Sequence, residues 1–182
     1  MHTIIIVILS ILLVSAVLAM LYITLYNKIQ FSKTRIDEAE KMIIEELSIR
    51  YDLLMECETD VTKNVKKELA IFSDLKEIKE RNISSYDFED KIKSSIDTLY
   101  LLLKDYPKLA SKKNIKEIVR KLEESDTKIE AAKSFYNKNN INLNKLLRKF
   151  PSNIIGKISK VTIQPNYKGK EVFSEETDGI NV

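Results

Sequence analysis

The chain has 182 residues, which is enough for one domain with an appendage. Its charge is nearly balanced, with 30 Lys or Arg against 27 Asp or Glu, and this balance argues against a dedicated nucleic-acid-binding protein. The only histidine is His2 and the only cysteine is Cys57, which excludes a histidine-based hydrolase, a histidine-ligated metal site and an intramolecular disulfide. The sequence therefore predicts no catalytic residues, no metal and no cofactor.

The first predicted element is a membrane-spanning helix at residues 3–26. Thr3 to Tyr26 carry no charge, and a helix of this length spans a hydrocarbon core of about 30 Å. Tyr22 and Tyr26 suit the aromatic belt at a membrane interface. A cleavable signal peptide is the alternative, but no basic segment precedes the run and the run is too long. We therefore expect a membrane anchor embedded in the lipid bilayer.

The orientation of this anchor is predicted from the basic residues beside it. Only the α-amino group and His2 precede the span, whereas Lys28, Lys33 and Arg35 follow it. Basic residues favour the cytoplasmic side of a membrane. We expect a single-pass protein of the cell membrane with its amino terminus outside and the remaining chain in the cytoplasm. The unpaired Cys57 fits this reducing compartment.

Residues 27–155 are predicted to form four amphipathic helices. No glycine or proline occurs before Pro107, which favours almost continuous helix. Ser84 or Ser85 can cap the third helix, and Pro107 ends it. The apolar residues of the first three helices recur at helical spacing: Ile29, Ile36, Ala39, Ile43 and Leu47; Val61, Val65, Leu69, Phe72 and Leu75; Phe88, Ile92, Ile96, Leu99 and Leu103.

The fourth helix is expected to start at a Ser111 cap, and its apolar residues are spaced by seven: Ile115, Leu122, Ile129, Tyr136, Leu143 and Phe150. Sustained seven-residue spacing indicates packing against nearly parallel or antiparallel helices. The predicted fold is all-α, with an antiparallel, up-and-down four-helix bundle behind the anchor. A long homotypic coiled coil is the alternative, but the interruptions at "NISSYD" and "DYPKLAS" favour hairpins.

The carboxyl-terminal part of the chain combines basic and apolar residues. An up-and-down bundle returns the end of its fourth helix to the membrane surface, so anionic lipid headgroups are an expected partner of the basic residues there: Lys145, Arg148, Lys149, Lys157 and Lys160. The alternative is that Phe150 and the isoleucines after it only plug the end of the bundle. Residues 156–182 hold all three glycines and are predicted to be a polar tail, disordered from Gln164 onward.

Polar residues of the fourth helix recur every three or four residues and therefore share one face: Asp126, Glu130, Lys133, Asn137, Asn140 and Asn144. They either fix the register of the bundle through buried hydrogen bonds or line a groove for a peptide or headgroup. Four of them, together with Arg50, Asp52 and Tyr136, are the candidate binding residues: Arg50, Asp52, Asp126, Lys133, Tyr136, Asn137 and Asn144.

Five short segments, in order behind an amino-terminal anchor, resemble the LemA family: "YN" at 26–27, "IRYDLL" at 49–54, "YPKLA" at 106–110, "IEAAKSFYN" at 129–137 and "FPSNII" at 150–155. The resemblance implies a bacterial protein with one membrane helix and a four-helix bundle, of unsettled biochemical role. It also implies a turn between the first two helices, near residues 52–57. The proline and asparagine of the family pattern are Met55 and Glu56 here, and its second Tyr-Asn is Leu143-Asn144.

The expected function is that of a membrane-anchored, non-enzymatic interaction or scaffold protein at the bacterial cytoplasmic membrane. Its predicted partners are the lipid bilayer and another protein or a second copy of the chain, but not nucleic acid. The alternative is an enzyme, or the regulatory subunit of one, with a polar site lined by the fourth helix.

Overall fold

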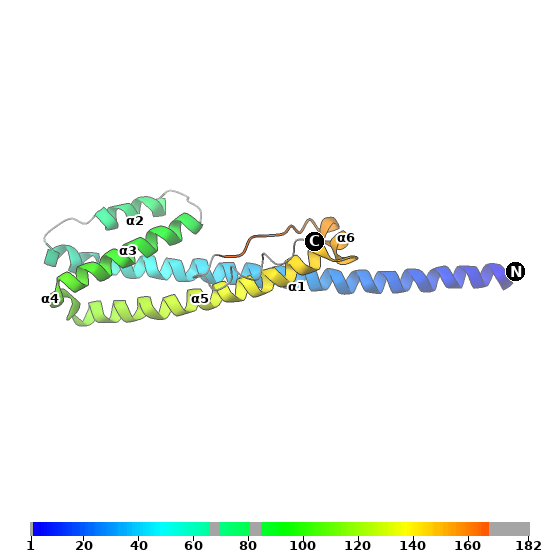
Figure 1. Ribbon diagram of the computed structural model, residues 1–182, viewed down its shortest axis with the longest axis horizontal. Helices are drawn as coiled ribbons and strands as arrows, with labels where there is room; N and C mark the ends of the chain where they lie inside the picture. The colour runs from blue at the N-terminus through cyan, green and yellow to red at the C-terminus, as the bar shows by residue number, and fades with distance from the viewer. Residues whose placement is uncertain (1, 66–69, 81–84, 168–182) are drawn as a thin grey trace, which may run out of the picture. The chain divides into compact units, whose positions relative to one another are not determined.

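The structure is a computed structural model that describes residues 2–65, 70–80 and 85–167 (Figure 1). All regular structure in these ranges is helical: α1 (His2–Val65), α2 (Ala70–Glu80), α3 (Ser85–Asp105), α4 (Pro107–Ala110), α5 (Lys113–Arg148) and α6 (Ser152–Ile158). The prediction of an all-α fold is confirmed. The predicted positions Leu69 and Ser84, and the tail from residue 168 on, lie outside the described residues.

The chain folds into two compact units. The terminal unit consists of the residues up to Ala39 together with those from Lys133 on, and the central unit runs from Glu40 to Ala132. Both α1 and α5 contribute residues to each unit.

In the central unit, α1 continues without interruption through residues 52–57, where a turn was expected. That prediction is wrong. Met55 and Glu56, which replace the Pro-Asn of the LemA pattern, are good helix formers and keep the backbone N–H groups that a helix needs. Leu54 and Cys57 are fully buried three residues apart, so this stretch packs as part of one continuous helical face.

The break after the first helix falls later, between Val65 and Ala70. The apolar stripe from Val61 to Leu75 was predicted to form one helix, and this prediction is wrong. Val61 lies on α1, whereas Phe72 and Leu75 lie on α2. All three are buried, so the stripe still predicts the core of the central unit correctly.

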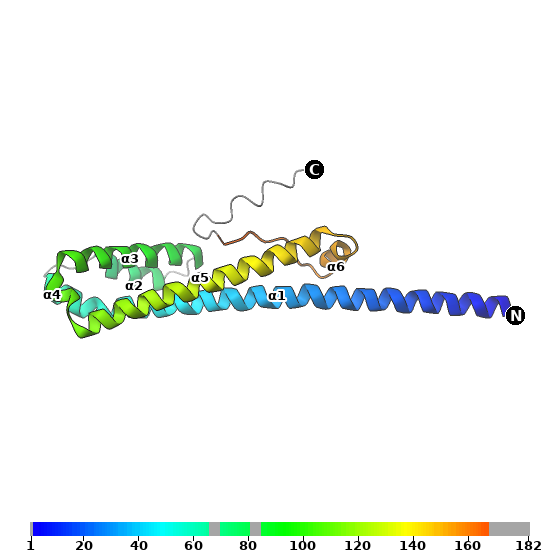
Figure 2. The same ribbon diagram turned by 60° about the horizontal axis from the view of Figure 1, so that its bottom comes forward.

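α2 and α3 lie side by side and run in opposite directions (Figure 2). α3 ends before Pro107, as predicted, because proline cannot continue it. Pro107 instead begins α4, a single turn. The Ser111 hydroxyl donates a hydrogen bond back to the Lys108 carbonyl oxygen of that turn, at 2.9 Å. The prediction that Ser111 caps the next helix is therefore wrong, and α5 begins at Lys113.

The seven-residue seam of α5 is buried at five of its six positions: Ile115, Leu122, Ile129, Tyr136 and Leu143. The sixth, Phe150, is 79% exposed. α5 ends at Arg148, and Phe150 lies in the turn that leads to α6, where helical spacing no longer decides which way a side chain points. The prediction of the seam is confirmed as far as Leu143 and is wrong at Phe150.

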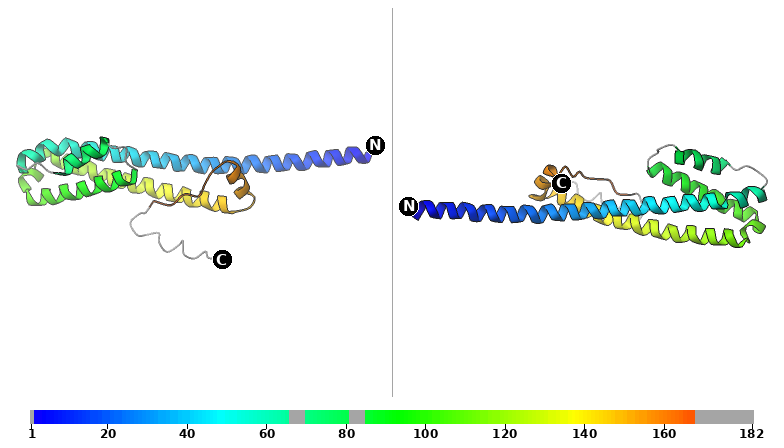
Figure 3. Two further views of the ribbon diagram at one scale, coloured as in Figure 1. Left: turned by 90° about the horizontal axis from the view of Figure 1, so that it is seen from above. Right: turned by 180° about the vertical axis from the view of Figure 1, so that it is seen from behind.

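In the terminal unit, α1 and α5 lie side by side in opposite directions, with α6 beside them (Figure 3). Their buried residues form one cluster, the terminal core: Ile29, Ile36, Ala39, Tyr136, Leu143 and Ile155. Leu25, Leu147 and Val161 pack against it. The guanidinium carbon of Arg35 lies 4.5 Å from the Phe31 ring centroid and 5.7 Å from that of Phe135, so a cation–π contact also links α1 and α5.

The short helix α6 was not predicted, and it ends in a Schellman motif. The Val161 N–H donates to the Gly156 carbonyl oxygen at 3.0 Å, and the Lys160 N–H donates to that of Lys157 at 3.1 Å. Lys160 takes the left-handed conformation that this motif requires, with φ 54°. The turn brings Val161 onto the terminal core and leads the chain into the segment that follows.

Among the described helices, α1 alone is long and apolar enough to cross a membrane, and none of its most apolar stretch is buried. Burial begins directly after it, since Ile29 has no exposed surface.

Candidate functional site

Asn137, Asn140 and Asn144 form an asparagine ladder along one face of α5, because they are spaced by three and four residues. They lie against Gln164–Tyr167, a segment without regular structure that we call the strap. Both the ladder and the strap belong to the terminal unit. At this face the sequence pattern predicted either hydrogen bonds that fix the register of the bundle or a binding groove.

Each end of the ladder pairs with the backbone N–H and C=O of one strap residue. Asn137 Nδ2 donates to the Tyr167 carbonyl oxygen at 2.9 Å, and the Tyr167 N–H donates to Asn137 Oδ1 at 2.8 Å. Asn144 Nδ2 donates to the Gln164 carbonyl oxygen at 3.0 Å, and the Gln164 N–H donates back to Asn144 Oδ1 at 3.4 Å. A side-chain amide can pair with both backbone groups of one residue because it offers one donor and one acceptor side by side.

Asn140, at the middle of the ladder, is fully buried. Its Nδ2 donates to the carbonyl oxygens of Gln164 and Pro165 and to Asn166 Oδ1, at 2.9, 3.1 and 2.7 Å. Its Oδ1 is buried without a hydrogen-bond partner in the structure. A side-chain amide does not ionise near neutral pH, so the ladder is suited to holding a peptide backbone and not to acid–base chemistry.

Tyr136 adds an aromatic contact beside the ladder. Its hydroxyl donates to Gln164 Oε1 at 3.2 Å, and its ring meets the Tyr167 ring edge-on, with centroids 4.7 Å apart. The strap is therefore held by its backbone and by one ring. The predicted disorder is wrong for Gln164–Tyr167, because the asparagines satisfy the backbone groups of a segment that has no secondary structure. For residues 168–182, the prediction lies outside the described residues.

Arg50 and Asp126 meet in the central unit. The Arg50 side chain is only 8% exposed, and its Nη2 donates to Asp126 Oδ1 at 2.7 Å while its Nε donates to Ser125 Oγ at 3.1 Å. Asp126 is 61% exposed, so a buried cation is neutralised by a carboxylate that still reaches water. Asp52 is exposed on α1, and Ser125 was not foreseen as a partner.

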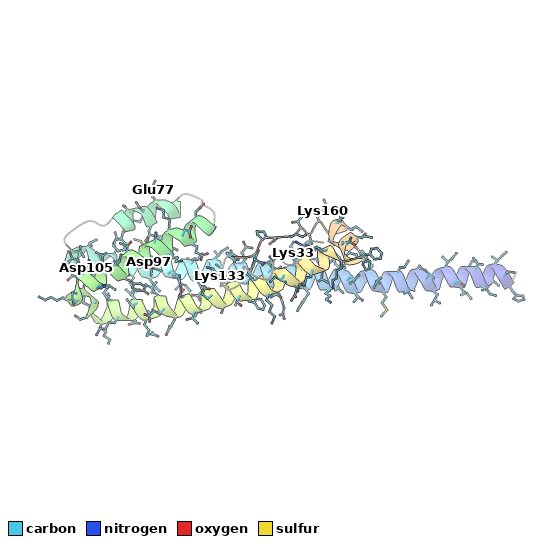
Figure 4. All side chains as sticks on the ribbon, viewed as in Figure 1. Lys33, Glu77, Asp97, Asp105, Lys133 and Lys160 are labelled. Carbon is cyan, nitrogen blue, oxygen red and sulfur yellow. The ribbon has the colours of Figure 1, made fainter. Side chains whose placement is uncertain are left out.

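Five of the seven predicted binding residues fall into two sets of contacts. Arg50 and Asp126 form an ion pair in the central unit, whereas Tyr136, Asn137 and Asn144 hold the strap in the terminal unit. Lys133 lies on α5 with little exposed surface (Figure 4). The helical spacing identified the ladder, but nothing in the sequence identified Gln164–Tyr167 as its partner.

The sequence pattern of the LemA family matches residues 39–179, well over half of the chain. The chain belongs to the LemA family. The matched region contains the ladder, the strap and the Arg50–Asp126 pair. It begins later and ends later than the resemblance seen in the short segments, which ran from residue 26 to 155. No curated protein sequence matches the chain.

This LemA chain exposes all five of its predicted membrane-proximal basic residues: Lys145, Arg148, Lys149, Lys157 and Lys160. Figure 4 shows Lys160 directly after α6. Ile155 is buried in the terminal core, whereas Phe150, Ile154 and Ile158 are exposed. The plug interpretation is therefore right for Ile155 and wrong for the other three apolar side chains.

A depression of about 500 Å³ lies elsewhere, in the central unit, between α3, α4 and α5. Its lining includes Tyr100 from α3 and Lys116 and Glu123 from α5. Partial burial and, as a smaller cause, the nearby Glu123 carboxylate raise the pKa of the Tyr100 phenol. None of the seven predicted binding residues lines this depression.

Proposed function

We propose that this LemA-family protein is a single-pass, membrane-anchored interaction protein of the bacterial cytoplasmic membrane, without enzymatic activity of its own. The observation that carries the proposal is the contrast along α1. The most apolar stretch of residues 3–26 is unburied, whereas Ile29 and Ile36, farther along the same helix, are buried in a core. A helix that is apolar all round and uncovered has the character of a membrane span.

The soluble part is proposed to be an up-and-down four-helix bundle made of α1, α2, α3 and α5. The antiparallel arrangement of α2 and α3 and the buried seven-residue seam of α5 support this arrangement.

The proposed orientation places the amino terminus outside and the bundle in the cytoplasm. It is supported by Lys28, Lys33 and Arg35, which follow the span, and by the unpaired Cys57.

An interaction role is supported by how the polar candidates are used. Arg50, Asn137 and Asn144 make hydrogen bonds within the chain, as structural groups do. Large apolar side chains remain exposed on α1 beyond the span, among them Met42 and Ile49, which are seven residues apart on one face. Exposed apolar groups that share a face suit a protein partner or a second copy of the chain.

One observation favours the alternative of an enzyme or a regulatory subunit. The depression beside Tyr100 is concave and combines apolar lining with Lys116 and Glu123, a combination found in small-molecule sites. In that case the site would use α5 residues other than the asparagine ladder.

Topology is tested by cysteine labelling in intact cells with an impermeant maleimide. Cys57 is fully buried, so the native thiol should not be labelled and should not add to the signal of the introduced cysteines. His2→Cys should be labelled from outside, and Ser94→Cys, at an exposed position of α3, should be labelled only after permeabilisation. The reverse pattern would place the bundle outside. Release of the protein by alkaline washing would contradict a membrane span.

The interaction role is tested by crosslinking in cells, with photoreactive residues at positions 42 and 49 of the intact protein. We expect a discrete adduct with a protein partner or a second copy. The matched control is position 94, on the exposed side of α3. Equal, diffuse crosslinking at all three positions would contradict an interaction surface on α1.

A further inference from the structure

We propose that the turn between α5 and α6, together with α6, forms a second membrane contact that inserts into the headgroup region of an anionic leaflet. We call it the interfacial face. It consists of the exposed apolar residues Phe150, Ile154 and Ile158 and the cations beside them, Arg148, Lys149, Lys157 and Lys160. The inference rests on the proposed membrane anchor and adds a lipid class as the ligand of this part of the chain.

The apolar half of the face points away from the core. Ile155 is buried among the residues of the terminal core, while Ile154 and Ile158, four residues apart on another side of α6, are 49% and 62% exposed. Phe150 precedes them and is more exposed still. Three large apolar side chains gathered on a tip that already has a packed core mark a contact surface.

In the described part of the chain after Lys133, no carboxylate accompanies the charged half of the face. Between Glu130 and Glu171 the sequence contains nine Lys or Arg and no Asp or Glu. In the described part of the terminal unit, the only carboxylates are those of Asp37 and Glu38 on α1. Basic and acidic residues are nearly equal in number over the whole chain but are unevenly distributed along it. The described part of the terminal unit is therefore basic and complements an anionic surface.

The position of α6 along α1 matches the membrane surface. Ile155 packs in the terminal core with Ile29, and Leu25 packs against the same core. The charge-free run of α1 ends at Tyr26, and its first cation is Lys28. α6 therefore lies at the level where the span ends, which is the level of the lipid headgroups.

The composition of the face suits lipid better than nucleic acid. Isoleucine side chains offer no ring for stacking on bases, and single-stranded nucleic acid is bound mainly by aromatic residues and cations. Isoleucine and phenylalanine beside lysines are typical of segments that lie in the membrane interface. Each cation near an anionic leaflet favours that contact by about fivefold.

The insertion is tested with a tryptophan reporter, because the chain contains no tryptophan. Full-length Phe150→Trp is reconstituted into vesicles of phosphatidylcholine, with or without phosphatidylglycerol, that carry bromine on the upper acyl chain. We expect blue-shifted emission and strong quenching in the anionic vesicles. The matched control is Leu101→Trp, at an exposed apolar position of α3, which should show neither. Equal quenching at the two positions would overturn the inference.

The charge requirement is tested in the same reporter. Adding Lys149→Gln and Lys157→Gln should reduce the quenching of the reporter at position 150 in anionic vesicles to its level in phosphatidylcholine. Lys93→Gln with Lys104→Gln, two exposed lysines of α3, should leave it unchanged. Equal loss in the two double variants would overturn the inference. A blue shift of the reporter that depends on the protein-to-lipid ratio and not on lipid charge would also overturn the inference, because it would assign the face to contact with a second copy of the chain.

Failure of the inference can be told from failure of the anchor. Alkaline extraction of the same vesicles reports whether the chain spans the membrane. A chain that resists extraction while the reporter at position 150 behaves like the control reporter at position 101 retains its anchor and has no interfacial face. A chain that is extracted has no span, and the proposed function fails with it.

Discussion

Asn137 and Tyr167 are joined by two hydrogen bonds between the side-chain amide of Asn137 and the backbone N–H and C=O of Tyr167, and neither bond uses the Tyr167 side chain. The pair needs a donor and an acceptor from residue 137 at the same time. Aspartate supplies only acceptors, although it has nearly the same shape. This makes position 137 a sensitive test of whether the ladder holds the strap.

Asn137→Asp should detach the Tyr167 end of the strap from α5, because the carboxylate would face the Tyr167 carbonyl oxygen. We expect a loss of about 1–3 kcal/mol in the free energy of unfolding, the cost of a buried group that loses its partner. Hydrogen–deuterium exchange in detergent should show the Tyr167 amide exchanging faster. Asn142→Asp, on the exposed side of α5, is the matched control and should change stability by less than about 0.5 kcal/mol. Equal exchange at Tyr167 in both variants would argue against the ladder.

Asp126→Asn should destabilise the central unit by about 1–2 kcal/mol, because the buried Arg50 guanidinium loses its counter-charge while keeping a polar neighbour. Chemical denaturation measures the change. The control is Glu124→Gln, which weakens an ion pair with Arg120 whose two side chains are both more than half exposed. That variant should cost less than about 0.5 kcal/mol. A larger effect at Glu124 than at Asp126 would mean that burial of Arg50 is not what matters.

Burial raises the pKa of the Cys57 thiol from its ordinary 9.0 to about 12. Because the folded pKa is the higher one, the unfolded chain releases this proton first. The stability that Cys57 contributes is therefore fully present below pH 9 and falls as the pH rises toward 12. At pH 8 the folded protein should not react with maleimide, and the denatured protein should react readily.

The pH dependence is isolated by comparison with Cys57→Ala. The wild-type protein should lose stability relative to the variant as the pH rises above 9, since only the wild type carries the thiol. A difference between the two proteins that stays constant up to pH 11 would show that the thiol is not desolvated in the folded state.

Ile129→Asp should unfold the central unit or weaken it by several kcal/mol, because a charge without a partner would be buried in the α5 seam. Total stabilities are typically about 5–15 kcal/mol, so such a loss is severe. Ala131→Asp introduces the same charge on the exposed face of α5, two residues away, and should cost less than about 1 kcal/mol. Similar denaturation midpoints for the two variants would show that the register of α5 is wrong.

Periodicity predicted the parts of this fold that depend on one face of one helix. The seam from Ile115 to Leu143 is buried as its spacing required, and α3 ends where Pro107 demands. The turn expected near residues 52–57 had no support in the local sequence. It was carried over from a family pattern whose Pro-Asn this chain lacks, and the helix propensity of Met55 and Glu56 predicts the outcome better.

The candidate site was only half predictable, because it depends on contacts between distant segments. The spacing of Asn137, Asn140 and Asn144 showed that a polar face needs partners, and such a face is expected to be satisfied when buried. Gln164–Tyr167 has neither helical nor strand periodicity, so its backbone could not be recognised as that partner. The exposed Phe150 was missed for a related reason, since the seven-residue count loses its meaning once α5 ends at Arg148.

Within the terminal unit, α1 contains no glycine or proline and therefore offers no hinge at which it could bend sharply between residues 3–26 and the terminal core. With residues 3–26 in a bilayer, a change in hydrocarbon thickness is met by tilting or sliding the whole helix. Ile29 and Ile36 lie on the same rod and must move with it. If residues 3–26 span a bilayer as proposed, the terminal core of α1, α5 and α6 would therefore shift or tilt together with the span when the thickness of the bilayer changes.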